Sequence, residues 1–299
     1  MLQQTRIEAV TRAYERFMRA LPTLTALAAA DVDDVLAQWS GLGYYSRARA
    51  LHRAAKMVVA GGAQQFPRDY DGARSLPGVG SYTAAAVLSI AYGQAYAAVD
   101  GNVVRVLSRL ACLRRPDTKG EPHRSLADEL LDRRRPGDWN QALMELGETI
   151  CLPKAPRCNE CPLRRYCRAF VEQRVHLHPP PKPRRKVEKI ELTMTLIRDR
   201  AGRVLLERGA FPYLPHMWLP AIEIGVAANG VQPQAKFRHA ILHRDFRVSL
   251  FDRVIGAAEL KRVQRANDAQ RRLFRPADLR RIGRSSLLSK ALKPAGKPT

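Results

Sequence analysis

The sequence predicts a multidomain protein in which an all-α N-terminal domain precedes an α+β C-terminal domain. The length of 299 residues is more than one domain usually contains and favours about two. Up to residue 170 the apolar residues recur every three or four positions, the spacing of packed helices. A proline-rich, basic segment then gives way to alternating apolar and polar residues, which are typical of strands. We therefore expect domains at 1–170 and 189–299, joined by a linker at 171–188.

The first domain contains a series of amphipathic segments, each with the periodicity of a helix that buries one face. Asp31 stands directly before the second segment, where an aspartate side chain commonly caps a helix. The helices are expected at 7–18, at 32–39, from about Ser46, at 81–92, at 101–111 and behind Asp138.

Beyond the linker the pattern changes to that of a sheet. Residues 190–197 alternate in polarity, residues 199–202 offer a turn, and residues 203–207 continue as a second strand. A second strand pair is expected around 246–251, and a helix near 287–292. This mixture makes the second domain α+β.

The charge of the chain is strongly positive. Lys and Arg number 51 against 28 Asp and Glu, which gives a net charge of +23. Residues 1–170 hold 24 basic and 17 acidic residues, whereas the remainder holds 27 and 11. Nucleic acid is therefore the first partner to expect, and a merely solvated basic surface is the alternative. No apolar run approaches the roughly 20 residues that span a bilayer, so no membrane partner is expected.

The first residues, Met1 to Thr5, show neither the basic and apolar regions of a signal peptide nor the composition of a transit peptide. A cytoplasmic location is therefore expected, where thiols stay reduced. Of the five cysteines, Cys112 is expected as a buried helix residue.

The other four cysteines form the pattern Cys151-x6-Cys158-x2-Cys161-x5-Cys167, interrupted by prolines. A compact loop of this kind can wrap four thiolates around one metal centre. The set suits either a 4Fe-4S cluster or a structural zinc ion, and the spacing alone does not distinguish them. Arginines inside and beside the loop indicate a phosphate-facing surface rather than a redox centre that turns over.

A second pattern is the glycine turn from Leu76 to Ser81, which leads directly into an alanine-rich helix. Gly78 and Gly80 allow a tight turn, and Val79 lies between them. The amides at the helix N-terminus can then hold a phosphate without a cationic side chain. An ordinary turn between two helices is the alternative.

The glycine turn at 76–84, the segment 99–103 and the four-cysteine loop together resemble the endonuclease III superfamily of DNA glycosylases. Within that superfamily, residues 1–5 and 41–49 resemble the MutY-type adenine DNA glycosylases, which remove adenine mispaired with 8-oxoguanine. The resemblance covers the first domain. It implies a helix-hairpin-helix glycosylase domain with a 4Fe-4S loop at 151–167, followed by a Nudix-like C-terminal domain. It also implies a monomer that acts on double-stranded DNA with a mispaired adenine. The protein would be of the bacterial type and associated with the nucleoid through DNA.

The resemblance also implies catalytic roles for three residues. Asp100 matches the catalytic aspartate, whose carboxylate stabilises the positive charge that develops on the sugar when the glycosidic bond breaks. Helix capping is the alternative role, and the two can coexist. Asn102 matches the asparagine that supports this aspartate. Tyr82 stands where bifunctional members carry a Schiff-base lysine, which implies a monofunctional enzyme.

The resemblance further implies a set of DNA contacts. Gln4 matches a wedge glutamine and Tyr44 an aromatic residue, both inserted into the base stack when a nucleotide is flipped out. Without the surrounding pattern, core packing would be the alternative for Tyr44. The full set of expected DNA-binding residues is Gln4, Thr5, Tyr44, Gly78, Val79, Gly80 and His243.

The chain departs from the family pattern at both ends. The glutamate that protonates the adenine in the family falls two positions before Met1, so we expect this chain to be catalytically impaired as it stands, and Glu8 is a poor substitute. A start further upstream and a decayed paralogue are the two explanations, and the retained residues favour the first. In the C-terminal domain, the Phe-Ser-His triplet that contacts 8-oxoguanine reads Ile241-Leu242-His243, which removes the serine hydroxyl.

The resulting hypothesis is an adenine DNA glycosylase of base excision repair that removes adenine opposite 8-oxoguanine or guanine. A catalytically silent protein that binds mismatched DNA is the first alternative. A glycosylase of the same superfamily with another target, such as thymine opposite guanine, is the second. No Nudix catalytic signature of clustered glutamates is present, so hydrolysis of nucleoside diphosphate derivatives is not expected.

Overall fold

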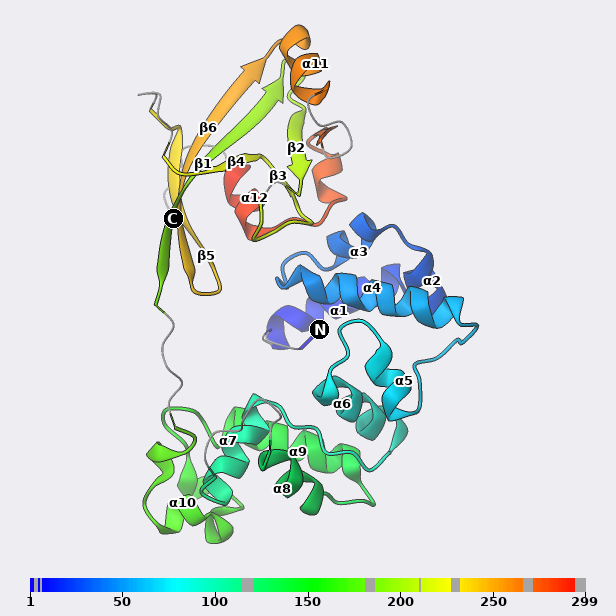
Figure 1. Cartoon of the computed structure of the whole chain (residues 1–299), viewed down its shortest axis with the longest axis vertical. Helices are drawn as coiled ribbons and strands as arrows, with labels where there is room; N and C mark the ends of the chain where they lie inside the picture. The colour runs from blue at the N-terminus through cyan, green and yellow to red at the C-terminus, as the bar shows by residue number, and fades with distance from the viewer. Residues whose placement is uncertain are drawn as a thin grey trace. The chain divides into compact units, whose positions relative to one another are not determined.

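The computed structural model divides the chain into two compact units, which are described separately (Figure 1). The hairpin unit is residues 65–184, and the sheet unit is residues 1–64 together with 185–299. No described helix is both long and apolar enough to cross a membrane. The residues whose structure is described are 1–2, 5, 7–113, 121–180, 186–209, 211–226, 232–265 and 271–293.

The hairpin unit is helical. Helix α9 packs on both α6 and α7, and the core between α7 and α9 contains Val103, Leu107 and Leu143. Helix α5 packs on α6 through Ala73 and Leu88. The elements are α5 (Tyr70–Ser75), α6 (Ser81–Tyr92), α7 (Gly101–Leu110), α8 (His123–Glu129), α9 (Pro136–Thr149), η1 (Cys158–Glu160), η2 (Arg164–Tyr166), α10 (Arg168–Val171) and η3 (Val175–Leu177).

The sheet unit begins with a group of helices around a core that includes Phe17, Val35, Leu36 and Trp39. Asp31 caps α3 as predicted, because its side chain accepts a hydrogen bond from the amide of Asp33 at 2.7 Å. The helices are α1 (Ile7–Ala20), α2 (Leu24–Ala29), α3 (Val32–Gln38) and α4 (Tyr45–Ala60).

The rest of the sheet unit is a mixed sheet with strands in the order β3-β2-β1-β6-β5. Strand β1 runs parallel to β6 along its whole length, and its other edge pairs with β2 and β4 in antiparallel fashion. The elements are β1 (Glu188–Asp199), β2 (Val204–Arg208), β3 (Trp218–Leu219), β4 (Ala221–Ile224), β5 (Ala235–Ile241), β6 (Arg244–Ile255), α11 (Ala257–Arg265), β7 (Arg271–Phe274), η5 (Asp278–Arg280) and α12 (Ser286–Ala291).

Helix α12 covers the sheet and joins its core, because Leu287 and Leu288 are fully buried among the side chains of β1, β2 and β6. The segment between η5 and α12 meets the N-terminal helices. A Cβ atom on Gly283 would lie only 2.6 Å from the Cβ of Leu36 on α3, so the two backbones approach closely there.

The predicted elements are present, with some corrections. The helices before residue 170, the mixed sheet beyond residue 188, the 190–207 hairpin and the C-terminal helix are confirmed. The domain bounds 1–170 and 189–299 stay a prediction. Helix α9 begins at Pro136 rather than behind Asp138, because proline suits the first helical turn. Cys112 is not a buried helix residue: it follows α7 with a φ of +53° and is half-buried.

The linker prediction falls partly on folded residues. The 3-10 turn η3 lies within the predicted 171–188 segment, and Arg109 donates a hydrogen bond to the carbonyl of His178 at 2.9 Å. Residues 181–185 lie outside the described part of the chain.

Candidate functional site

The glycine turn lies between α5 and α6 as predicted. The amide of Val79 donates to the carbonyl of Leu76 at 3.1 Å, and Gly78 has a φ of +78°, which favours glycine. Gly80 then caps α6 with extended backbone and without a side-chain cap. Gly80 thus leaves the N-terminus of this 12-residue helix without a side-chain cap, the arrangement in which the first amides of a helix can bind an anion.

Asp100 lies at the N-terminus of α7, where one carboxylate oxygen accepts a hydrogen bond from the amide of Val103 at 2.8 Å. The capping role considered for this residue is therefore real. Among the described residues no hydrogen bond reaches the other carboxylate oxygen, Oδ2. The cap fixes the orientation of the side chain and leaves Oδ2 for chemistry.

Tyr82 approaches Asp100 from α6. Its hydroxyl donates to the sulfur of Met144 at 3.3 Å, and the side chain is half-buried. Burial raises the pKa of the Tyr82 hydroxyl above its ordinary value, and the nearby charge of Asp100 raises it further. Tyr82 is therefore a neutral phenol at physiological pH and cannot act as an amine nucleophile.

Asn102 belongs to a network behind the α7 N-terminus. Arg105 donates to the side-chain oxygen of Asn102 at 2.9 Å, to the carbonyl of Gly147 at 2.6 Å and to the carbonyl of Cys151 at 2.7 Å. A Cβ on Gly147 would lie 2.7 Å from the Cβ of Asn102. The lack of a side chain at Gly147 thus allows α9 to seat against α7 below Asp100.

The four cysteines of the loop line one pocket together with Arg109, Phe170 and other apolar residues. Burial, followed by the charges of neighbouring cysteines, raises the pKa of Cys158; burial is also the main cause of the raised pKa of Cys167. In the described part of the chain, no three Cys, His, Asp or Glu side chains stand close enough to hold a metal ion. The four thiols therefore line one pocket, but they are not clustered at the distances of metal ligands.

Arg109 organises this loop from the middle of the hairpin unit. It is 3% exposed, and it donates to the sulfur of Cys151 at 3.2 Å and to the carbonyls of Leu152 at 2.8 Å and Pro153 at 3.1 Å. A buried guanidinium with these partners fixes the backbone at the first cysteine of the loop.

Tyr44 belongs to the sheet unit. It precedes α4 with a φ of +46°, its side chain is 48% exposed, and the Arg47 guanidinium lies over its ring at 5.4 Å. Arg47 also donates to the hydroxyl of Thr5 at 2.9 Å and to the carbonyl of Met1 at 3.0 Å. The structure therefore brings Thr5 and Tyr44 together through Arg47, whereas Gln4 lies outside the described residues.

His243 and Leu242 form the turn between β5 and β6. Leu242 is 74% exposed with a φ of +57°, and Nδ1 of His243 is buried without a hydrogen-bond partner among the residues that the structure describes. This turn presents an apolar side chain at the tip of a hairpin rich in arginine.

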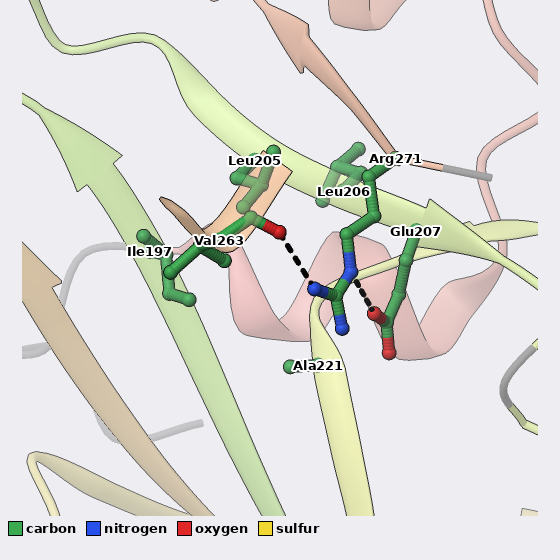
Figure 2. A pocket seen from close by; sticks show the side chains of 7 residues that line it. All are labelled: Ile197, Leu205, Leu206, Glu207, Ala221, Val263 and Arg271. Carbon is green, nitrogen blue, oxygen red and sulfur yellow. Dashed lines mark hydrogen bonds and ion pairs between the residues drawn. The ribbon is translucent and has the colours of Figure 1, made fainter. Parts of the chain in front are cut away.

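The sheet carries a small pocket of its own, shown in Figure 2. Arg271 crosses it and donates to Glu207 at 3.0 Å and to the carbonyl of Val263 at 2.8 Å. The acid and the base neutralise each other, so the pocket offers no free general acid or base. Its other lining residues are Ile197, Leu205, Leu206 and Ala221.

Comparison with known proteins shows a matching family over the first part of the chain. Residues 1–130 match the family described as HhH-GPD superfamily base excision DNA repair protein. Over 180 residues the chain is 48% identical to an adenine DNA glycosylase of Schizosaccharomyces pombe, which covers 58% of this chain and 39% of that protein. Over 173 residues it is 46% identical to an adenine DNA glycosylase of Homo sapiens, with 56% and 32% covered.

A longer match extends into the sheet. Over 262 residues the chain is 29% identical to an adenine DNA glycosylase of Buchnera aphidicola subsp. Acyrthosiphon pisum, which covers 81% of this chain and 75% of that protein. The matches to Schizosaccharomyces pombe and Homo sapiens span only 39% and 32% of those relatives' own length.

Two solved structures resemble part of the chain. A thermostable thymine-DNA glycosylase is 26% identical with a TM-score of 0.50, and covers 57% of this chain and 80% of its own. A trapped endonuclease III–DNA covalent intermediate is 25% identical with a TM-score of 0.52, covering 57% and 81%. The resemblance to MutY-type glycosylases is confirmed by the family and sequence matches, and the helix-hairpin-helix fold by these structures as well.

The structure thus brings some predicted residues together and adds others. Asp100, Tyr82 and Asn102 lie around the start of α7. Arg105, Gly147 and Arg47 were not singled out from the sequence as functional. The spacing of Arg105 three residues after Asn102 on one helix was an available signal.

Proposed function

We propose that this chain, which resembles the MutY-type adenine DNA glycosylases, removes adenine from mispaired duplex DNA. The observation that carries the proposal is Asp100, held by its cap at the start of α7 with Tyr82 beside it. The glycine turn before α6 and the net charge of +23 support DNA as the partner.

The proposed chemistry uses the fixed carboxylate. A flipped adenosine places its sugar next to Asp100, and the carboxylate stabilises the positive charge that develops at the anomeric carbon as the bond to adenine breaks. Water adds to that carbon and gives up a proton, and adenine leaves after it takes up a proton from a general acid. Asn102 and Arg105 hold the first turn of α7, so the carboxylate does not need to reorganise during the reaction. Gly78, Val79 and Gly80 hold a DNA phosphate through backbone amides.

The proposed enzyme is monofunctional. An enzyme that also cleaves the strand needs an amine to form an imine with the sugar, and Tyr82 supplies a neutral phenol instead. Release of adenine therefore leaves an intact strand with an abasic site.

The loop 151–167 fits a 4Fe-4S cluster in its donor set. Four thiols line one pocket with an apolar wall, and Arg109 already supports the first of them. Cys151, Cys158, Cys161 and Cys167 would hold the cluster. When bound, it fixes the loop and its arginines as a phosphate-facing surface.

The C-terminal sheet is proposed to be Nudix-like and to meet the base opposite the adenine. His243 retains the histidine of the family's triplet as a candidate base contact, whereas Leu242 offers only apolar contact. Discrimination of 8-oxoguanine from guanine is therefore proposed to be weak, because no hydroxyl stands at position 242.

A single-turnover assay tests the proposal on two duplexes, one with adenine opposite 8-oxoguanine and one with thymine opposite guanine. It compares the 299-residue chain with a form extended upstream by the glutamate-containing helix that the resemblance implies. Release of adenine, with the strand intact until alkali is added, supports a monofunctional adenine glycosylase. Tight mismatch binding without release in either form supports the silent binder, and release only of thymine opposite guanine supports another target.

A further inference from the structure

The turn that presents Tyr44 has an unusual backbone. Gly41, Gly43 and Tyr44 have φ values of +95°, +66° and +46°. An aromatic residue rarely adopts this left-handed conformation, and it persists only where neighbouring structure enforces it. Something outside the turn must therefore hold residues 40–45 in place.

The main chain of Arg284 bridges the two ends of this turn. Its amide donates to the hydroxyl of Ser40 at 3.1 Å, and its carbonyl accepts from the hydroxyl of Tyr45 at 2.5 Å. The main chain of one residue in the C-terminal segment thus closes a turn that is more than 200 positions away in the sequence. Burial raises the pKa of Tyr45, which keeps its hydroxyl a donor.

Arg284 is itself held rigidly. Ile282 is buried in the sheet core, and Ser285 caps α12 by accepting from the amide of Leu288 at 3.0 Å. Tyr45 packs against both the sheet core and the core of the N-terminal helices. The clamp therefore transmits the position of the sheet to the start of α4.

The side chain of Tyr44 has a different kind of support. The indole N–H of Trp39 donates to the carbonyl of Gly43 at 3.1 Å, and Arg47 lies over the rings of both Trp39 and Tyr44. These contacts close the turn from inside but leave the ring of Tyr44 half-exposed. The direction of the Tyr44 ring is therefore set by the backbone conformation of the turn rather than by packing in the protein core.

We propose that Ser40, Tyr45 and the main chain of Arg284 form a clamp that positions Tyr44 for insertion beside the flipped nucleotide. This inference rests on the proposed function for the role of Tyr44. Through the clamp, the C-terminal sheet helps to open the duplex by holding Tyr44 in position, without itself touching DNA at the clamp. Ser40 and Tyr45 are positioning residues, not catalytic ones.

Domain docking alone is a weaker explanation for these contacts. A separate contact already ties the sheet to α3: Asp33 pairs with Arg208 and accepts from the indole N–H of Trp218 at 3.2 Å, and the Arg208 guanidinium lies 4.3 Å above the Trp218 ring. Removing one hydroxyl at the turn leaves this second contact intact. The two roles are therefore separable by substitution.

The first arm of the test measures the turn without DNA. Hydrogen exchange of the amides of residues 41–45 is compared in the unaltered chain, Tyr45→Phe and Ser40→Ala. Tyr92→Phe is the matched control, because its hydroxyl also donates to a carbonyl, that of Phe66 at 3.3 Å, but in the hairpin unit. We expect exchange in the turn to rise about 3- to 10-fold, the equivalent of one lost hydrogen bond, with no change in the control.

The second arm measures opening of the duplex by 2-aminopurine fluorescence, with this base in place of the mispaired adenine. Tyr45→Phe is expected to reduce the fluorescence rise by about the same 3- to 10-fold, while affinity for a fully paired duplex stays unchanged and the melting temperature falls no further than in Tyr92→Phe. Unchanged exchange in the turn would overturn the clamp. Faster exchange with normal opening would overturn its link to Tyr44.

The two proposals fail in different ways. If the unaltered chain binds no duplex and opens no base, the glycosylase proposal fails, and the exchange arm still decides whether the clamp exists.

Discussion

Replacement of Gly147 by alanine should slow adenine release far more than it destabilises the fold. The added Cβ would lie 2.7 Å from the Cβ of Asn102 and 3.2 Å from its Cα and carbonyl carbon. Restoring ordinary contact at about 3.4 Å requires α7 and α9 to separate by roughly 0.7 Å, which lengthens the bond from Arg105 on α7 to the carbonyl of Gly147 on α9.

The expected loss of stability is modest. Overpacking costs about 1–3 kcal/mol, and the better helix propensity of alanine offsets roughly 1 kcal/mol of it. The expected loss of rate is larger, because a displacement approaching 1 Å at a reacting group costs on the order of 100-fold. We therefore expect release to fall by about 10- to 100-fold, measured under single-turnover conditions with thermal unfolding in parallel.

Gly137→Ala is the matched control. Its Cβ would lie 2.9 Å from the carbonyl oxygen of Ser89 and 3.0 Å from the Cα of Ile90, a comparable clash on the same helix but against α6. It should cost similar stability without the loss of rate. Equal rates for the two variants would refute the argument that Gly147 positions Asn102.

Three further predictions concern other parts of the chain. Arg109→Leu removes every hydrogen bond from this guanidinium to the cysteine loop, so the purified protein should lose iron and its visible absorbance; full retention would contradict the supporting role. Because the pKa of Tyr82 is raised in the folded state, its protonated hydroxyl stabilises the fold at every pH below the ordinary pKa of 10.0, and this contribution is lost as the pH rises through the folded pKa. The free energy of unfolding, measured with denaturant, should therefore fall above about pH 10, and Tyr82→Phe should make that fall smaller. Leu242→Ser should raise the ratio of release opposite 8-oxoguanine to that opposite guanine by about 10-fold, and an unchanged ratio would remove position 242 from base recognition.

Local signals predicted the elements that carry the chemistry. The cap at Asp31, the glycine turn before α6 and the aspartate that begins α7 each depend on residues within a few positions of one another. Helices α2 and α5 were missed because each has six residues, too few for a clear apolar periodicity.

Long-range contacts could not be predicted from the sequence. The approach of Gly147 to Asn102 and the bridge from Arg284 to Ser40 join segments that are distant in the chain. Neither contact has a composition or spacing that marks it, because the bridge uses main-chain atoms of Arg284 and the approach depends on a missing side chain. The prediction for Cys112 was wrong for a different reason: α7 ends at Leu110, one residue earlier than the apolar pattern indicated, and Cys112 then has a left-handed backbone.

Asp100→Asn tests the central claim most directly. Asparagine caps a helix about as well as aspartate, so α7 should keep its start while the negative charge is lost. In the form extended upstream by the glutamate-containing helix, we predict that release of adenine opposite 8-oxoguanine falls by at least about 100-fold with binding and melting temperature unchanged. Release at the unaltered rate would contradict the assignment of Asp100 as the group that stabilises the sugar.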